Sequence, residues 1–167
     1  MSSSIEMAFQ IVPYRYEYQK EAASLIVGIQ AEEFSIPITL EDQPDLLDVD
    51  GFYRHRMGDF WIAMDGERVI GTIALRDIGS RQGALRKMFV HRDFRGAQKG
   101  VAAGLLKRLL EESKQRGFQE IFLGTTEAFR AAHRFYEKQG FEQVTAEELP
   151  STFPKMKQDT RFYRKVL

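Results

Sequence analysis

The sequence contains no cysteine, and this absence removes several kinds of chemistry. A chain without thiols has no disulfide bonds, no thiolate zinc site and no cysteine nucleophile. No apolar run approaches the roughly 18 residues that a membrane-spanning helix requires. Residues 1–15 lack the basic stretch and long apolar segment of a secretory signal. We therefore expect a cytoplasmic protein that has no membrane partner.

An excess of charge of one sign is also lacking. The 24 Lys and Arg residues balance the 24 Asp and Glu residues, so no global basic field attracts nucleic acid. The three histidines, at positions 55, 91 and 133, have no metal-ligand spacing. The chain has neither a P-loop nor a G-x-G-x-x-G dinucleotide fingerprint. We expect no metal and no nucleic-acid partner.

The order of the remaining patterns predicts one mixed α/β domain over residues 1–167. Two apolar segments, Phe60–Met64 and Val69–Leu75, flank Asp65-Gly66 and predict a hairpin. The strands Ala84–Val90 and Glu120–Thr125 are joined through an amphipathic helix, which predicts a parallel pair. The other expected elements are strands at Phe9–Arg15, Phe141–Val144 and Asp159–Val166, and helices at Tyr16–Phe34, Pro44–His55 and from Thr126 to about Gln139.

Together these elements predict a central sheet of about seven strands, with a parallel central pair, flanked by about four helices. The most informative connection follows Met88-Phe89-Val90, where Arg95-Gly96 and Gly100 lead into a helix with a periodic leucine face. Such a turn presents backbone N–H groups and the positive end of a helix dipole to one point, which suits a phosphate. A strand–turn–helix connection needs glycine for steric reasons as well, so the turn alone leaves both interpretations open.

Two motifs together resemble the GNAT (Gcn5-related) N-acetyltransferase family, and the order of elements is similar along nearly the whole chain. The residues that carry this resemblance are Met88-Phe89-Val90, Arg95-Gly96, Gly100-Val101-Ala102, Leu105-Leu106, Ala132, Phe135-Tyr136-Glu137 and Gly140-Phe141.

The resemblance implies acetyl-coenzyme A as the donor and a primary amine as the acceptor. We expect the amine of a small molecule, with a protein lysine or an N-terminal amine as the alternative. It implies that Met88, Phe89 and Val90 bind the pantetheine arm in a gap where the Phe89 and Phe122 strands separate. The pyrophosphate would be held by a turn made of Arg95, Gly96, Ala97, Gln98, Lys99, Gly100, Val101 and Ala102. The resemblance also allows a homodimer, although no residue marks an interface.

Two positions depart from the family pattern. Ala97 stands where the phosphate loop usually has Arg or Gln, so Gln98 and Lys99 would supply compensating contacts. Phe129 stands where many members have an asparagine, so the corresponding cofactor contact would come from Thr126 or the backbone. These departures keep a second function open, a non-catalytic module that binds acyl-CoA as a sensor.

Tyr136 is the candidate catalytic residue. With no cysteine to carry the acyl group as a thioester, direct attack by the amine is the simplest route, and the departing thiolate needs a proton donor. A tyrosine hydroxyl can be that donor. Phe129, Ala132 and Tyr136 also share one helix face, so the spacing alone is equally typical of a core tyrosine.

The acceptor site is predicted less sharply. Glu33 and Phe34 end a helix beside a loop that could wall the site, and Glu127 follows the central strand. A solvated helix end and a favourable charge in a first helical turn are the alternative roles of the two carboxylates. Further candidate walls are Phe34–Leu40, Phe52–Tyr53, Phe60-Trp61 and Pro150–Met156. Their aromatic residues are equally suited to the core, and for Trp61, which lies inside a strand, the core is favoured.

Overall fold

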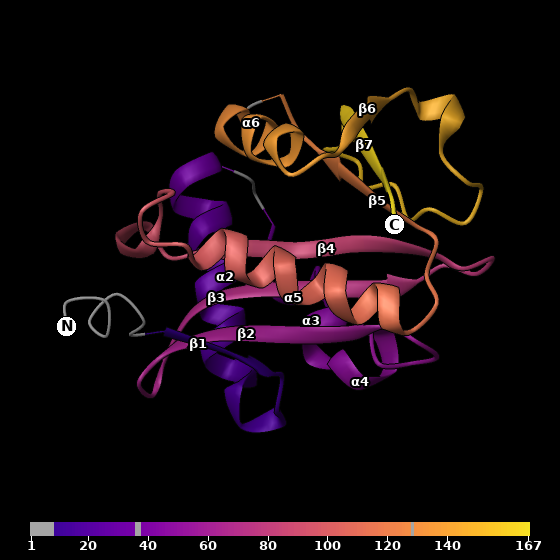
Figure 1. The fold of residues 1–167 in the computed structure, drawn as a ribbon. Coiled ribbons are helices and arrows are strands. Elements are labelled where there is room, and N and C mark those ends of the chain that lie inside the picture. The colour runs from indigo at the N-terminus through magenta and orange to yellow at the C-terminus, as the bar shows by residue number, and fades with distance from the viewer. Residues whose placement is uncertain (1–8, 36–37, 128) are drawn as a thin grey trace, which may run out of the picture.

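The computed structural model describes residues 9–35, 38–127 and 129–167, and in these ranges seven strands form one mixed sheet (Figure 1). The strands are β1 (Phe9–Pro13), β2 (Asp59–Asp65), β3 (Arg68–Asp77), β4 (Gln82–Val90), β5 (Glu120–Thr125), β6 (Glu142–Val144) and β7 (Arg161–Val166). The α-helices are α2 (Gln19–Phe34), α3 (Pro44–Leu47), α4 (Val49–Phe52), α5 (Val101–Gln115) and α6 (Arg130–Lys138). Short 3-10 turns lie at Tyr16–Tyr18, Arg92–Phe94 and Ala146–Glu148.

The strands lie in the order β1-β2-β3-β4-β5-β7-β6, and helices cover both faces. Successive side chains of a strand point to opposite faces. Trp61 therefore packs in the core cluster of Leu105 on α5, whereas Ile62 packs in the cluster of Ile26 on α2. Figure 1 shows α5 lying across β2, β3 and β4 on the near face. No helix among the described residues is long and apolar enough to cross a membrane.

The central parallel strands β4 and β5 pair only at their beginnings. The paired residues are Gln82 with Glu120, Gly83 with Ile121, and Ala84 with Phe122, while β4 continues to Val90. Figure 1 shows β5, β7 and β6 turned away from the β1–β4 part of the sheet. The expected separation of the two strands is therefore confirmed.

A bulge in β4 contributes to this separation. Lys87 has a positive φ of 53°, and the register with β3 shifts between Thr72 and Ala74. An extra residue in one strand bends that strand and strengthens its twist. The hydroxyl of Thr72 donates a 2.7 Å hydrogen bond to the Lys87 carbonyl oxygen and holds the bulge in place.

Most of the predicted elements are confirmed, and two are corrected. The last helix begins at Arg130 and not at Thr126, because the Phe129 N–H bonds to the Thr126 carbonyl oxygen in a separate turn and no side chain caps α6. The predicted helix Pro44–His55 is two short helices. Asp48 interrupts it, since its backbone leaves the helical region and its side chain accepts a hydrogen bond from the Gly51 N–H at the start of α4.

Candidate active site

The turn before α5 is closed by hydrogen bonds from the N–H groups of Lys99 and Gly100 to the Gly96 carbonyl oxygen. Gly96 and Gly100 have positive φ values of 106° and 74°, and Gly100 is the residue that precedes the helix. No side chain caps α5 and no acidic residue lies in its first turn. The first N–H groups of a helix have no acceptor within the helix, so they and the helix dipole favour an anion at this point.

A groove of about 490 Å³ runs from this turn to α6, and we call it the α5–α6 groove. Met88 and Val90 line one side of it, Gly96 and Gly100 line the turn, and Tyr136 lines the far wall. The groove also runs along the part of β4 that follows Ala84. This part of β4 does not pair with β5, so its backbone groups face the gap between the two strands. A phosphate-bearing ligand with an extended arm fits this arrangement of free amides, apolar walls and unpaired strand edge.

Two smaller chambers of about 130 Å³ each lie on the other side of the gap, and we call them the β4–β5 chambers. Arg86, Lys87 and Asp159 are the charged residues that line both chambers. Met88, Ala132 and Tyr136 line one chamber as well as the groove. These shared residues make the groove and the chambers neighbours.

Tyr136 lies where the groove and a chamber meet. Its side chain is 7% exposed, and its ring contacts those of Phe135 and Phe141. Its hydroxyl has no hydrogen-bond partner in residues 9–35, 38–127 and 129–167. Burial raises the pKa of this hydroxyl well above its ordinary value of 10, so the group keeps its proton at neutral pH. Such a group can donate a proton to a leaving group.

Lys87 belongs to a buried polar network beside the chambers. Its ammonium lies 3.5 Å from Asp45 Oδ2 and donates to Gln43 Oε1. The Tyr53 hydroxyl donates a 2.5 Å hydrogen bond to the same carboxylate oxygen of Asp45. Burial lowers the pKa of Lys87, and burial also raises the pKa of Tyr53. The charge of Lys87 is compensated within the protein.

Comparison with known proteins identifies the family of the chain. Residues 24–141 match the family model described as "Acetyltransferase (GNAT) family". The chain belongs to the GNAT family. This confirms the resemblance carried by the two motifs, and the glycine turn and Tyr136 are the parts of this GNAT chain that form the groove.

Solved and curated proteins agree with this assignment. A GNAT-family acetyltransferase from Staphylococcus aureus Mu50 is 35% identical, with a TM-score of 0.91 over 95% of this chain and 99% of its own. N-acetylaspartate synthetase from Xenopus tropicalis is 36% identical over 104 residues, which are 60% of this chain and 37% of that protein. The chain thus spans little more than a third of the first curated relatives' length.

The cofactor of the family is acetyl-coenzyme A. PaiA N-acetyltransferase from Thermoplasma acidophilum shares the fold, with a TM-score of 0.72, 15% identity and coverage of 96% of this chain and 100% of its own. That protein was solved in complex with coenzyme A. The uncapped first amides of α5 and the unpaired edge of β4 are the features of this GNAT chain that suit the same molecule.

The predicted phosphate-loop residues differ in whether they line the α5–α6 groove. Gly96, Ala97, Gly100 and Ala102 line the groove, whereas the side chain of Val101 is buried in the core and leaves only its N–H available. The side chains of Gln98 and Lys99 are exposed.

Arg95 lines the groove but is held by its neighbours. Its guanidinium donates hydrogen bonds of 2.5 and 2.8 Å to the two carboxylate oxygens of Glu33, and its Nε donates to the Val90 carbonyl oxygen at 2.8 Å. These hydrogen bonds lower the pKa of Glu33. Glu33, predicted as an acceptor residue, therefore connects α2 to the phosphate loop.

The other predicted acceptor residues are dispersed. Glu127 is exposed and lies 3.6 Å from Arg161, in a hollow beside α6 that is separate from the chambers. The Phe34 side chain lies outside the described part of the structure. Phe60 and Trp61 are 0% and 1% exposed and belong to the core, as favoured for Trp61, so neither is in the acceptor wall. Buried β-branched and aromatic neighbours on both faces of β2 explain this outcome.

Thr126, predicted as a cofactor contact, lines one chamber and not the α5–α6 groove, and its carbonyl oxygen lies 2.8 Å from His133 Nε2. His133 is buried, and its Nδ1 lies 2.9 Å from Arg161 Nη1. Phe153 and Met156, from the link Pro150–Met156, line a chamber. The described residues contain no cluster of three or more His, Cys, Asp or Glu that could hold a metal ion.

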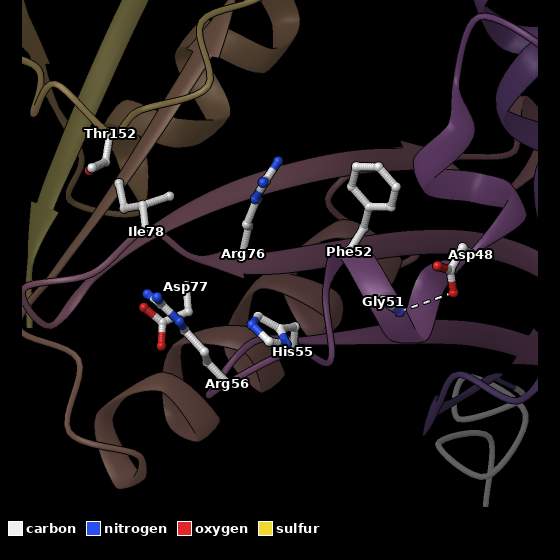
Figure 2. A pocket seen from close by; sticks show the side chains of 9 residues that line it. All are labelled: Asp48, Gly51, Phe52, His55, Arg56, Arg76, Asp77, Ile78 and Thr152. Atoms are coloured by element: carbon white, nitrogen blue, oxygen red, sulfur yellow. Dashed lines mark hydrogen bonds between the residues drawn. The ribbon is translucent and has the colours of Figure 1, made fainter.

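A separate hollow of about 400 Å³ lies at the opposite end of β4 from the glycine turn (Figure 2). Figure 2 shows Arg76 and Phe52 on its upper side and Asp77, Arg56 and His55 below. Asp77 accepts hydrogen bonds from the N–H groups of Met57 and Gly79, so its carboxylate is used by the local turns. This hollow shares no lining residue with the groove and is not the candidate site.

Sequence reasoning missed Arg86 and Asp159, which line both chambers. The signal for Arg86 was present, since Arg86-Lys87 interrupts an otherwise apolar strand, Ala84–Val90. Asp159 had no comparable signal. It lies in the connection before β7, and only the fold brings it against β5.

Proposed function

We propose that this protein is an N-acetyltransferase that moves the acetyl group of acetyl-coenzyme A directly to the primary amine of a small molecule. The observation that carries the proposal is the junction at Tyr136, where the α5–α6 groove meets a β4–β5 chamber. A donor arm in the groove and an amine in the chamber would face each other at this residue.

The residues of the site support a direct transfer. The acceptor must attack as a neutral amine, so its ammonium first loses a proton. The nitrogen then bonds to the carbonyl carbon of the acetyl thioester and gives up a second proton, the C–S bond breaks, and the departing sulfur takes up a proton. Tyr136 holds a proton at Oη, in a buried position at the junction, and can donate it there. The N–H groups at the start of α5 would hold the phosphates, and Met88, Phe89 and Val90 would hold the arm through their backbone.

A small acceptor is supported by the size of the chambers. Each chamber measures about 130 Å³, whereas sites for drug-sized ligands measure roughly 300–1,000 Å³. The relative named N-acetylaspartate synthetase carries a name that refers to a small acetylated molecule. A cytoplasmic location and a homodimer stay predictions from the sequence.

Release of free thiol from acetyl-coenzyme A tests the proposal. The acceptor panel should contain polyamines, amino acids, amino sugars and lysine peptides, and calorimetry of acetyl-coenzyme A alone should accompany it. We expect binding of the donor and turnover with one class of small amine. Binding without turnover on any amine would favour the sensor function, and the absence of binding would contradict the whole assignment of the groove.

A further inference from the structure

Arg86 is a cation that forms no ion pair with the described residues. It lies half-buried on β4 and lines both of them. Its Nη2 lies 3.4 Å from the Met156 sulfur, a weak acceptor, and no carboxylate of the described residues forms an ion pair with it. A guanidinium has five N–H donors in a planar fork that matches a carboxylate. Arg86 is therefore suited to receive an anionic group of a ligand.

Asp159 lines the same chambers, and its carboxylate can accept further hydrogen bonds. Its Oδ2 accepts a 2.9 Å hydrogen bond from the Met156 N–H, and the described residues provide no donor to its Oδ1. The carboxylate lies against Gly124, where a Cβ atom would come within 2.6 Å of Oδ2. Gly124 lies on β5 after Phe122, the last residue of that strand that pairs with β4. Asp159 therefore lies beside the gap between the two strands.

The two charges complement one kind of molecule. Arg86 and Asp159 line the same chambers. Arg86 contacts the sulfur of Met156 and Asp159 accepts from its N–H, yet the two charged side chains do not form an ion pair with each other. The remaining charge, that of Lys87, is compensated by Asp45. The chambers therefore offer one cation and one anion that form no ion pair with each other. A ligand with an ammonium and a carboxylate satisfies both, whereas a polyamine leaves the guanidinium unpaired and adds like charge.

We infer that the acceptor is an amino acid, whose carboxylate is bound by Arg86 and whose ammonium is bound by Asp159. The inference rests on the proposed function, because it names the substrate class of that site. Contact with Asp159 places the nitrogen at the gap between β4 and β5, on the side of the chamber that Tyr136 lines. Arg86 then fixes the orientation of the amino acid.

Matched sets of acceptors test this inference. Each set contains an L-amino acid, its amide and the amine that lacks the carboxyl group, for example phenylalanine, phenylalaninamide and phenethylamine, with parallel sets for aspartate and methionine. The assay measures kcat/KM by thiol release from acetyl-coenzyme A. A site built for a carboxylate leaves its buried donors unpaired when that group is missing. We expect at least one amino acid to exceed its amide and its amine by about 100-fold or more.

Variants separate the contact from a general effect of charge. Arg86→Gln should raise KM for the amino acid by about 100-fold and abolish its advantage over the amide and the amine. Calorimetry of acetyl-coenzyme A should show that the donor still binds. Asp159→Asn should lower kcat/KM for all three members of a set, because all three carry the ammonium. Arg76→Gln is the matched control. Arg76 lies on the neighbouring strand and lines the separate hollow, so the preference for the amino acid should survive.

The outcomes distinguish the inference from the proposed function. Equal turnover of amide and amino acid, or a preference that survives in Arg86→Gln, overturns the inference and leaves the acetyltransferase function in place. Binding of acetyl-coenzyme A without turnover of any amino acid also overturns it. If the protein neither binds acetyl-coenzyme A nor releases thiol, the proposed function fails and the inference fails with it.

Discussion

Lys87 and Asp45 are two ionisable side chains that remain buried because they face each other. Their side chains are 6% and 11% exposed, and Asp45 is further held by the Tyr53 hydroxyl. Removal of one member leaves the other charge buried and unpaired, which costs about 3–5 kcal/mol. We expect Lys87→Met to lower the free energy of unfolding by about 3 kcal/mol, measured by urea unfolding, since Tyr53 still donates to Asp45.

The double variant Lys87→Met/Asp45→Asn provides the control. It removes both charges, while the amide of residue 45 can still accept from Tyr53, so it should recover most of the loss. A double variant as unstable as Lys87→Met alone would show that packing of the lysine stem, and not the pairing of charges, accounts for the stability.

The contrast between Tyr136 and Arg86 shows what sequence reasoning can reach at the scale of residues. Tyr136 was predicted because it belongs to a motif whose members are near one another in the chain. The significance of Arg86 depends on Asp159 and Met156, which are distant in sequence and meet it only across β4, β5 and the connection to β7. No local sequence pattern predicts that these three residues lie close together.

At the scale of elements, the phosphate site depends on the backbone before α5. Gly100 has a φ of 74° and open space around it, so an alanine there meets backbone strain and no clash. An alanine in the left-handed region costs about 1–2 kcal/mol, which the turn can relieve by moving the first amides of α5. We expect Gly100→Ala to weaken binding of coenzyme A by about 10-fold in calorimetry, a change of roughly 1.4 kcal/mol.

Gly79→Ala is the matched control for this prediction. Gly79 also has a positive φ, of 90°, and open space around it, but it lies in the turn between β3 and β4. Both variants should lose comparable stability, and only Gly100→Ala should lose affinity. Equal affinities for coenzyme A would mean that the amides before α5 do not hold the phosphates.

Elements with strong local signals were predicted well. The hairpin at Asp65-Gly66, the parallel pair and the long α5 follow from alternation, turn residues and helical periodicity. The start of α6 was misplaced because a threonine after a strand is a good cap by composition, whereas here the chain first makes a turn at Phe129. The bulge at Lys87 was not predicted, since it depends on a hydrogen bond from the neighbouring strand.

At the scale of the whole molecule, the pair of Glu33 and Arg95 joins α2 to the phosphate loop. The hydrogen bonds from Arg95 lower the pKa of Glu33 below its ordinary value of 4.5. A carboxylate with a lowered pKa in the folded state contributes stability above its unfolded pKa, and this contribution is lost as the pH falls through the folded value. Because both side chains are partly exposed, the pair contributes at most about 1 kcal/mol.

Glu33→Gln should therefore be less stable than the wild type at pH 7, and the difference should shrink as the pH falls below 4.5. Urea unfolding of both proteins at several pH values measures the difference. A difference that persists at pH 3 would assign the loss of stability to packing of the side chain and not to its charge.

The central claim is that Tyr136 donates a proton at the junction of the groove and the chamber, and Tyr136→Phe tests it most directly. The control is Tyr163→Phe, because the ring of Tyr163 lies 6.1 Å from that of Tyr136 while its hydroxyl donates to Glu137. Thiol release from acetyl-coenzyme A and calorimetry of its binding should be measured for both variants. We predict that Tyr136→Phe loses about 100-fold or more in kcat, keeps its affinity for acetyl-coenzyme A and unfolds like the wild type. Undiminished thiol release by Tyr136→Phe would contradict the account.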